Sequence, residues 1–299
     1  MRGSDGTSYI YISCSWHSYC IARLWAGTIC GRMIFQAGDV EVDVLELVRI
    51  AEDAGKVILE IYSKDVDSWE QKIKADDSPL TVADLKANDL ICTRLKELTP
   101  EFPIMSEELE QLPYEQRKSW SYYWCVDPLD GTKEFIKRNG DFTVNIALMH
   151  ENHGVVGVVH TPVRDQTHYA ASKLGAFVRK QADQPRPIKV ESYAMSDPNL
   201  TLVCSASHLD PRTEEYMAQF TEPKTVSMGS SLKFLLVAEG AAHVYPRFAP
   251  TMEWDTAASQ VIVEEAGGEV VVVETEKPLT YNRENLLNPY FICRGQCIA

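Results

Sequence analysis

Two aspartates, Asp127 and Asp130, stand three positions apart in the segment WCVDPLDGTKEF, residues 124–135. The apolar run before them predicts a buried strand that ends at Val126, because Pro128 cannot continue a hydrogen-bonded ladder. Both carboxylates would then lie in one tight turn, where they repel each other unless a cation bridges them. Oxygen ligands of this kind suit a hard divalent cation such as Mg²⁺.

The residues after this pair predict a place for an anion. Gly131 allows a sharp turn or the close approach of a ligand to the backbone, and a helix is expected to begin near Thr132. Free N–H groups at a helix start attract anions, so a metal ion and a phosphate would meet here. One alternative stays open, in which Asp130 merely caps the helix in an ordinary turn.

Other phosphatase chemistries fit the sequence less well. A cysteine-dependent phosphatase loop would need Arg at position 131, where the chain has Gly131. An aspartyl-phosphate nucleophile would need acids with one residue between them, and the spacing here is DxxD. The sequence contains no GxxxxGK[ST] loop for nucleotide phosphates.

The composition indicates an acidic globular protein. The chain has 299 residues, which at about 150 residues per domain predicts two lobes. Its formal net charge of −14 disfavours binding to DNA or RNA polymers, which need a basic surface. A small phosphorylated ligand remains compatible with this charge if metal ions or a local basic pocket screen it.

The cysteines and histidines indicate a reduced protein without a zinc site. None of the eight cysteines forms a CxxC pair, and the seven histidines are scattered. This pattern is typical of a cytosolic chain, so the expected location is cytoplasmic.

The first 40 residues differ from the rest of the chain. Residues 9–35 are apolar and aromatic, but His17, Arg23 and Arg32 interrupt them, so no membrane span is expected. Residues 1–40 are interpreted as a dispensable N-terminal extension. Three alternatives stay open: a start that does not belong to the folded protein, a surface-attached segment or a packed extra element. Peripheral association with the inner membrane also stays open.

Residues 41–188 are expected to form an α+β lobe. Apolar spacing predicts a helix over 42–62 and another that begins at Thr81 or Val82 and stops before Pro100. Alternation and turn residues predict strands at 102–108, 122–126, 142–149, 155–160 and 175–180.

Residues 189–299 are expected to form an α/β lobe. The polar, proline-containing stretch 181–199 holds the predicted boundary. Beyond it strand-like and helix-like segments alternate, which favours helices packed on a sheet. One of these helices is expected from Asp255 to Ala266, closed by two glycines.

Four motifs resemble those of the lithium-sensitive phosphatases, the inositol monophosphatase and fructose bisphosphatase superfamily. They are SPLTVAD (78–84), MSEE (105–108), the segment around Asp127, and EWDTAA (253–258). The resemblance covers about residues 44–292 and implies a layered αβαβα fold of two lobes. Two segments, DPLDGTKEFIKRNGDFTVNIAL and GSSLKFLLVAEG, are similar to the superfamily's bacterial 3′(2′),5′-bisphosphate nucleotidases.

The resemblance implies two Mg²⁺ ions, or three in the working state, and lithium inhibition. Glu107 and Asp127 would hold the first ion with the Leu129 carbonyl, and Asp127, Asp130 and Asp255 the second. The alternative for Asp255 is a cap on its own helix. The substrate-binding residues implied on the metal side are Glu107, Leu129, Asp130, Gly131, Thr132 and Asp255.

The resemblance also implies catalytic and nucleotide-side roles. Asp84 and Thr132 would orient the attacking water, and the backbone N–H groups of Gly131 and Thr132 would bind the phosphate. Asp84 alone is as well explained by a capping box with Thr81. His208 is placed on the nucleotide side, with a purely structural role as its alternative.

A second phosphate is the last feature expected of the substrate. Ser230 and Lys233 would share a face if a helix opened at Ser230, and Arg247 ends the next predicted strand. These residues favour a pocket for the 5′-phosphate of 3′-phosphoadenosine 5′-phosphate.

The expected function is Mg²⁺-dependent hydrolysis of the 3′-phosphate of that nucleotide to AMP, in sulfur assimilation or nucleotide recycling. The alternatives are an inositol phosphate phosphatase, a catalytically silent metal-dependent binding protein and a membrane-surface protein governed by residues 9–35. The sequence predicts no oligomeric state.

Overall fold

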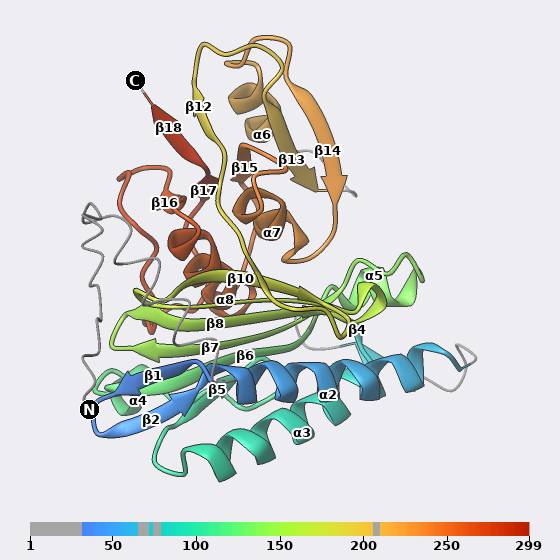
Figure 1. Cartoon of the computed structure of the whole chain (residues 1–299), viewed down its shortest axis with the longest axis vertical. Coiled ribbons are helices and arrows are strands. Elements are labelled where there is room, and N and C mark those ends of the chain that lie inside the picture. Colours follow the sequence, from blue (N-terminus) through green and yellow to red (C-terminus); the bar gives the residue numbers. More distant parts are fainter. Residues whose placement is uncertain (1–31, 65–71, 74–78, 206–209, 299) are drawn as a thin grey trace, which may run out of the picture. The chain divides into compact units, whose positions relative to one another are not determined.

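Helix α2 (Val44–Tyr62) begins where the Asp43 carboxylate accepts a hydrogen bond from the Leu45 N–H at 3.1 Å. The computed structural model describes residues 32–64, 72–73, 79–205 and 210–298. Helix α3 (Val82–Leu98) starts at the N-cap Thr81, as its sequence predicts. The two helices pack side by side on one face of the larger sheet (Figure 1).

The larger sheet has seven strands in the order β11-β10-β9-β8-β7-β6-β5. Only β5 and β6 run parallel, and the later strands follow as antiparallel neighbours. Their bounds are β5 Ile104–Ser106, β6 Tyr122–Asp130, β7 Thr143–His150, β8 His153–Thr161, β9 Gln166–Ala171, β10 Gly175–Lys180 and β11 Arg186–Pro187. The predicted hairpin β7–β8 and strand β10 are confirmed, whereas β9 was not predicted.

Strand β6 is longer than its sequence predicts. Its pairing with β7 jumps from Asp127 opposite Asn145 to Asp130 opposite Thr143, so β6 carries one extra residue as a bulge. The prediction that the strand ends at Val126 is therefore wrong. Proline interrupts the ladder, as expected, but the bulge absorbs it and the strand resumes.

Helix α8 (Glu253–Glu265) covers the other face of the seven-stranded sheet, and α7 (Leu232–Ala238) packs against α8. A five-stranded sheet, β14-β13-β15-β17-β16, follows beyond them (Figure 1). Its strands are β13 Thr201–Ser205, β14 Lys224–Met228, β15 Val244–Arg247, β16 Glu269–Val272 and β17 Phe291–Arg294. Helix α6 (Pro211–Met217) packs on β15, which completes the layered αβαβα arrangement.

The second sheet is mixed, because β17 runs antiparallel between β15 and β16. The expected boundary at residues 188 and 189 falls between the two sheets. The division into two lobes stays a prediction, since Ile34–Ala299 forms one compact unit.

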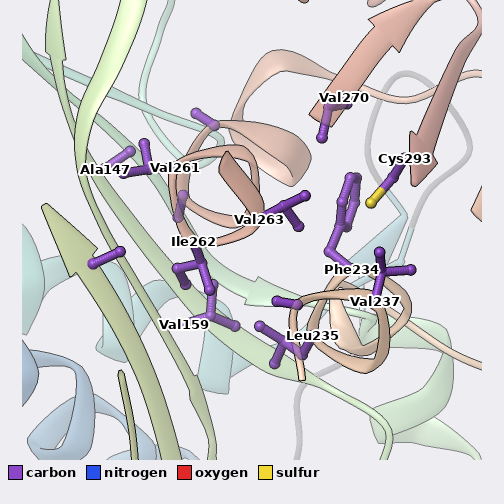
Figure 2. Close-up of a cluster of buried hydrophobic side chains, with 14 of the residues drawn as sticks. Ala147, Val159, Phe234, Leu235, Val237, Val261, Ile262, Val263, Val270 and Cys293 are labelled. Carbon is purple, nitrogen blue, oxygen red and sulfur yellow. The ribbon is translucent and has the colours of Figure 1, made fainter. Parts of the chain in front are cut away.

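The central core lies around α8, which is buried on several sides. Figure 2 shows Val261 of α8 next to Ala147 of the large sheet, and Val263 on the side of Phe234 from α7. Gly157 on β8 lets the helix come close, since a Cβ there would lie 2.2 Å from the Ala258 carbonyl oxygen. Both faces of β7 are consequently buried, although its alternating pattern suggests one buried face.

Short elements complete the described chain. Strands β1 (Ile34–Ala37) and β2 (Val40–Asp43) form a hairpin, so this part of the N-terminal segment is a packed element. No helix in the described ranges is long and apolar enough to span a membrane. The remaining elements are β3 Lys72–Ile73, β4 Pro79–Leu80, α4 Tyr114–Arg117, α5 Thr132–Ile136, the 3₁₀ helix Pro162–Arg164, β12 Ser192–Ala194 and β18 Gln296–Ile298.

Candidate active site

Three carboxylates meet where β6 ends against the first turn of α8. Asp127, Asp130 and Asp255 each offer one oxygen, and these oxygens all lie within 4.8 Å of one another. No other group of three such ligand side chains comes this close in the ranges that the structure describes. The fold thus brings together two acids from one strand and a third from about 125 residues further along the chain.

The bulge in β6 sets the first two carboxylates. The Asp127 side chain accepts a hydrogen bond from the Leu129 N–H at 3.0 Å, which closes a tight turn around the proline. Pairing resumes at Asp130, so both acids lie at the same end of the sheet. The bulge therefore brings two nearby carboxylates of one strand to a common point.

The electrostatics of the cluster favour a cation. Burial raises the pKa of Asp127 well above its ordinary value, and the charges of Glu107, Asp130 and Asp255 raise it further. Burial likewise raises the pKa of Asp255, with Asp130 and Glu107 as the next causes. A divalent cation would relieve this repulsion, and a donor set made only of oxygen atoms fits Mg²⁺ better than a softer metal.

Glu107 follows the strand beside β6. Its N–H donates to the Val126 carbonyl at 3.1 Å, which continues the parallel pairing of β5 and β6. Its side chain is one of the groups that raise the pKa of Asp127. Glu107 therefore lies beside the three-carboxylate cluster, on the side of Asp127.

Asp84 divides its two oxygens between a helix cap and the site. Its Oδ2 accepts hydrogen bonds from the Thr81 N–H and hydroxyl, both at 2.7 Å. Its Oδ1 accepts the Thr132 hydroxyl at 3.1 Å, and the same hydroxyl lies 3.4 Å from the Leu129 carbonyl oxygen. The cap and the site contact, which the sequence left as alternatives, are both present.

Asp255 combines the same two features. Its Oδ2 accepts the Met252 N–H at 2.9 Å and so caps α8. The residue nevertheless belongs to the carboxylate cluster. Capping and ligation are therefore compatible here, because a carboxylate has two oxygens.

Gly131 has a conformation and a position that favour glycine. Its φ of +97° is left-handed, and a Cβ there would lie 2.9 Å from the Asp141 carbonyl oxygen. Helix α5 begins at the next residue, Thr132, as expected. Glycine is therefore favoured at this turn by its backbone conformation and by the close approach of Asp141 and Ser230.

The expected second-phosphate residues lie next to the cluster. Lys233 is buried, donates to the Ser230 carbonyl at 2.6 Å and lies 5.4 Å from the centre of the Tyr245 ring. Burial lowers the pKa of Lys233 to about 8, and the charge of Arg247 contributes to this shift. Arg247 itself donates to the Thr251 hydroxyl at 2.7 Å.

Ser230 has a different setting from the one expected. Helix α7 begins at Leu232, so Ser230 is not on it and shares no helix face with Lys233. Its backbone is left-handed, with φ of 51°, and its hydroxyl donates to the Asp130 carboxylate at 2.7 Å. His208, the remaining expected residue, lies outside the described residues.

Sequence reasoning missed three polar residues beside the cluster. Ser231 bonds to Asp130, Asn145 bonds to Ser231, and Thr143 bonds to Asn145. The available signal was the pair of polar residues in the apolar strand FTVNIAL, both on one face.

Comparison with known proteins agrees with this geometry. Residues 41–291 match the inositol monophosphatase family. The chain is 45% identical over 247 residues to the 3′(2′),5′-bisphosphate nucleotidase CysQ of Salmonella typhimurium, covering 82% of this chain and 97% of the relative. These relationships were expected from the four sequence motifs.

Solved structures give the same result. The crystal structure of CysQ from Bacteroides thetaiotaomicron, a bacterial member of that family, matches with a TM-score of 0.74 and 42% identity, over 85% of this chain and 97% of that one. The suhB protein of Bartonella henselae shares the fold, with a TM-score of 0.66, 24% identity and coverage of 83% and 92%.

The match to the family runs from residue 41 to residue 291 and includes the αβαβα layers and the acid cluster at the end of β6. This chain therefore belongs to the inositol monophosphatase family.

Proposed function

We propose that this protein is a 3′(2′),5′-bisphosphate nucleotidase that hydrolyses the 3′-phosphate of 3′-phosphoadenosine 5′-phosphate to AMP and phosphate. The observation that carries the proposal is the cluster of Asp127, Asp130 and Asp255. Relatives named for this activity supply the substrate class. The cellular role would be sulfur assimilation or nucleotide recycling.

Proteins of this family are metal-dependent, and the acidic cluster could bind metal. We infer that the metal is Mg²⁺ and that two ions are held, with a third in the working state left open. Glu107, Asp127 and the Leu129 carbonyl would hold one ion, and Asp127, Asp130 and Asp255 the other. When bound, such ions make water more acidic and neutralise charge on the leaving oxygen.

The protein's own groups would orient the attacking water. The Thr132 hydroxyl has one proton, which is directed to Asp84 Oδ1 at 3.1 Å. Its oxygen is therefore left as an acceptor for a proton of the water, and Asp84 lies behind it as the proton's destination. The N–H groups of Gly131 and Thr132 would stabilise the phosphoryl oxygens as charge develops on them.

A second phosphate would distinguish this substrate from a monophosphate. Lys233 is a buried cation beside the cluster, and its charge and that of Arg247 influence each other. Asp130 partly offsets the cost of burying the Lys233 charge, and a further anion here would stabilise both cations. We propose that the 5′-phosphate supplies that anion, with Ser230 and His208 also on the nucleotide side.

A substrate panel tests this proposal directly. Phosphate release is measured from 3′-phosphoadenosine 5′-phosphate, adenosine 3′-monophosphate, inositol 1-phosphate, inositol 1,4-bisphosphate and fructose 1,6-bisphosphate. The bisphosphorylated nucleotide should be preferred, Li⁺ should inhibit, and excess chelator should stop the reaction. Robust activity in chelator contradicts the metal site, and preference for an inositol phosphate contradicts the substrate.

We also propose a cytoplasmic location. Of the described cysteines, Cys92, Cys125, Cys204 and Cys293 are free and buried, and Cys297 is free and exposed. Peripheral attachment through residues 9–35 is tested by lipid flotation of the full chain against a chain that starts at Asp43. Equal flotation of both chains contradicts attachment through this segment.

A further inference from the structure

The Asp130 carboxylate is held on one side only. Its Oδ2 accepts the Ser230 hydroxyl at 2.7 Å, the Ser231 N–H at 2.7 Å and the Ser231 hydroxyl at 2.8 Å. Its other oxygen accepts no hydrogen bond from any described residue. The two serines therefore fix the plane of the carboxylate and leave Oδ1 available within the cluster.

A second layer of polar side chains lies behind the serines. The side-chain amide nitrogen of Asn145 donates to the Ser231 hydroxyl at 2.9 Å. The Thr143 hydroxyl donates to the side-chain Oδ1 of Asn145, also at 2.9 Å. The Thr143 and Ser230 hydroxyl oxygens also lie 2.8 Å apart, where either group can donate in place of its bond to Asn145 or Asp130. Thr143, Asn145 and Ser231 are almost completely buried, so no bulk water competes for these contacts.

Counting protons shows which residue sets the direction of these hydrogen bonds. The Ser231 hydroxyl has one proton and lies near two acceptors, Asp130 Oδ2 at 2.8 Å and the Asp255 carbonyl oxygen at 3.0 Å. The Asn145 amide nitrogen can only donate, so the Ser231 oxygen must accept from it. The Ser231 proton is thereby turned away from β7, toward the two residues of the cluster.

The same contact links two separate parts of the fold. Asp130 comes from β6, and the Asp255 carbonyl belongs to the first turn of α8. Ser231 reaches both, and Asn145 pairs with Asp127 across the β6–β7 ladder. A single amide on β7 is therefore connected to all three carboxylate-bearing residues of the cluster.

We propose that Asn145 is a positioning residue for the metal site: through Ser231 it orients the Asp130 carboxylate and fixes the first turn of α8 against it. This inference deepens the proposed function and rests on it. Partners that orient ligands from behind typically account for a factor of about 10 to 100 in metal affinity.

A purely structural role is the competing explanation. Any buried amide with satisfied hydrogen bonds contributes to stability, and its loss lowers the melting temperature. A structural role predicts lower stability with unchanged metal affinity, whereas a positioning role predicts weaker metal binding as well. The two are separated by measuring metal binding directly, without substrate.

The experiment is a calorimetric titration of the nucleotide-free, full-length protein with Mn²⁺. Asn145→Ala should weaken Mn²⁺ binding roughly ten- to hundredfold. The matched control is Gln260→Ala on α8, which also removes a buried amide, one bonded to Tyr281, Glu264 and the Leu279 carbonyl. That control should lower the melting temperature and leave the Mn²⁺ affinity unchanged.

A double-mutant cycle tests the route through Ser231. If Asn145 acts on the cluster through this hydroxyl, Ser231→Ala and the double variant should bind Mn²⁺ equally weakly. Thr143→Val is nearly isosteric and gives a smaller loss in the same direction, which keeps the test open if Asn145→Ala does not fold.

Each outcome separates this inference from the proposed function. Wild-type protein that binds no Mn²⁺ contradicts the proposed function, and this inference with it. Wild-type protein that binds Mn²⁺, with the same affinity in Asn145→Ala or, failing that, Thr143→Val, contradicts the positioning role alone. Additive losses in the cycle would overturn the route through Ser231.

Discussion

A carboxylate lies at each end of helix α7, and the two carboxylates differ in the charge of their hydrogen-bond partners. At its C-terminal end, Glu239 accepts hydrogen bonds from His168 at 2.8 Å and from Arg186. At the other end, Asp130 receives only hydroxyl and N–H groups, and no Lys or Arg of the described residues forms an ion pair with the three-carboxylate cluster.

The difference is visible in the pKa values. Burial alone would raise the pKa of Glu239, but His168 and Arg186 bring it below its ordinary value. Burial and neighbouring acids raise the pKa of Asp127. The fold pairs a half-buried carboxylate with its own cations at Glu239, whereas Lys233 and Arg247 act on the cluster without forming an ion pair among the described residues. That contrast is what a site for an external cation requires.

The largest expected effect is at the cluster itself. Asp127→Asn should reduce phosphate release to background, because the carboxylate proposed to be shared by both ions becomes a neutral amide. The metal-free protein should melt at the same or a higher temperature, since a buried, repelled charge is removed. Activity assays and thermal melts in chelator check both. A large fall in melting temperature would show that the carboxylate serves the fold.

The next effect concerns the two cations near Asp130, which form no ion pair with the cluster and are proposed to bind the substrate. Lys233→Ala and Arg247→Ala should each lose about 1.5–3 kcal/mol on 3′-phosphoadenosine 5′-phosphate, or roughly ten- to a hundredfold in kcat/KM. Adenosine 3′-monophosphate lacks the second phosphate and should be affected far less. Equal losses on both nucleotides would assign these residues to the fold.

The pH dependence gives a smaller effect at the same place. Burial lowers the pKa of Lys233 to about 8, so the free enzyme loses this positive charge as the pH rises above that value. The KM for the bisphosphate should then rise by at most about tenfold per pH unit. Lys233→Arg should abolish this inflection, because arginine stays charged. An unchanged inflection in that variant contradicts the assignment to Lys233.

Glu239→Gln is the counterpart of Asp127→Asn. It should reduce the free energy of unfolding by about 1–3 kcal/mol, because His168 and Arg186 would face a neutral amide in place of a carboxylate. The lowered pKa of Glu239 means that this stability is present above the ordinary carboxyl pKa and is lost as the pH falls through the folded value. Denaturant titrations at two pH values measure it, and kcat should change little.

The smallest effect concerns the N-terminal segment. Deleting residues 1–31 should leave activity and melting temperature unchanged, because the family match starts only at residue 41. Deleting residues 1–40 also removes β1, including the buried Ala37, so some stability should be lost. Identical melting temperatures for both truncations would show that the hairpin is dispensable too.

The sequence predicts much of this fold because local signals and tertiary packing agree. The capping box at Thr81 marks the start of α3, and the turn residues between β7 and β8 mark their hairpin. The predicted end of β6 at Val126 was wrong because a bulge accommodates Pro128. Such a bulge depends on the pairing with β7 and has no clear signal in the sequence of β6 alone.

The candidate site also contains residues that the sequence predicts and residues that only the folded structure identifies. The motif acids could be named because four motifs together resemble a known family, although each acid alone could be a helix cap or a turn residue. Asn145 and Ser231 could not, because a polar residue in a strand and a second serine in a turn are common without any function. Only the folded chain brings Asn145 to Ser231 and Ser231 to Asp130.

The double use of Asp84 bears on how activity would be lost over evolutionary time. A relative that no longer needs catalysis would still be selected to keep this aspartate, because it starts α3 through Thr81. Asp255, which caps α8, is retained for the same reason. Asp127 caps no helix, and its burial among other acids opposes folding, so drift would remove it first. We therefore expect that a related chain without activity has replaced Asp127 before Asp84 or Asp255.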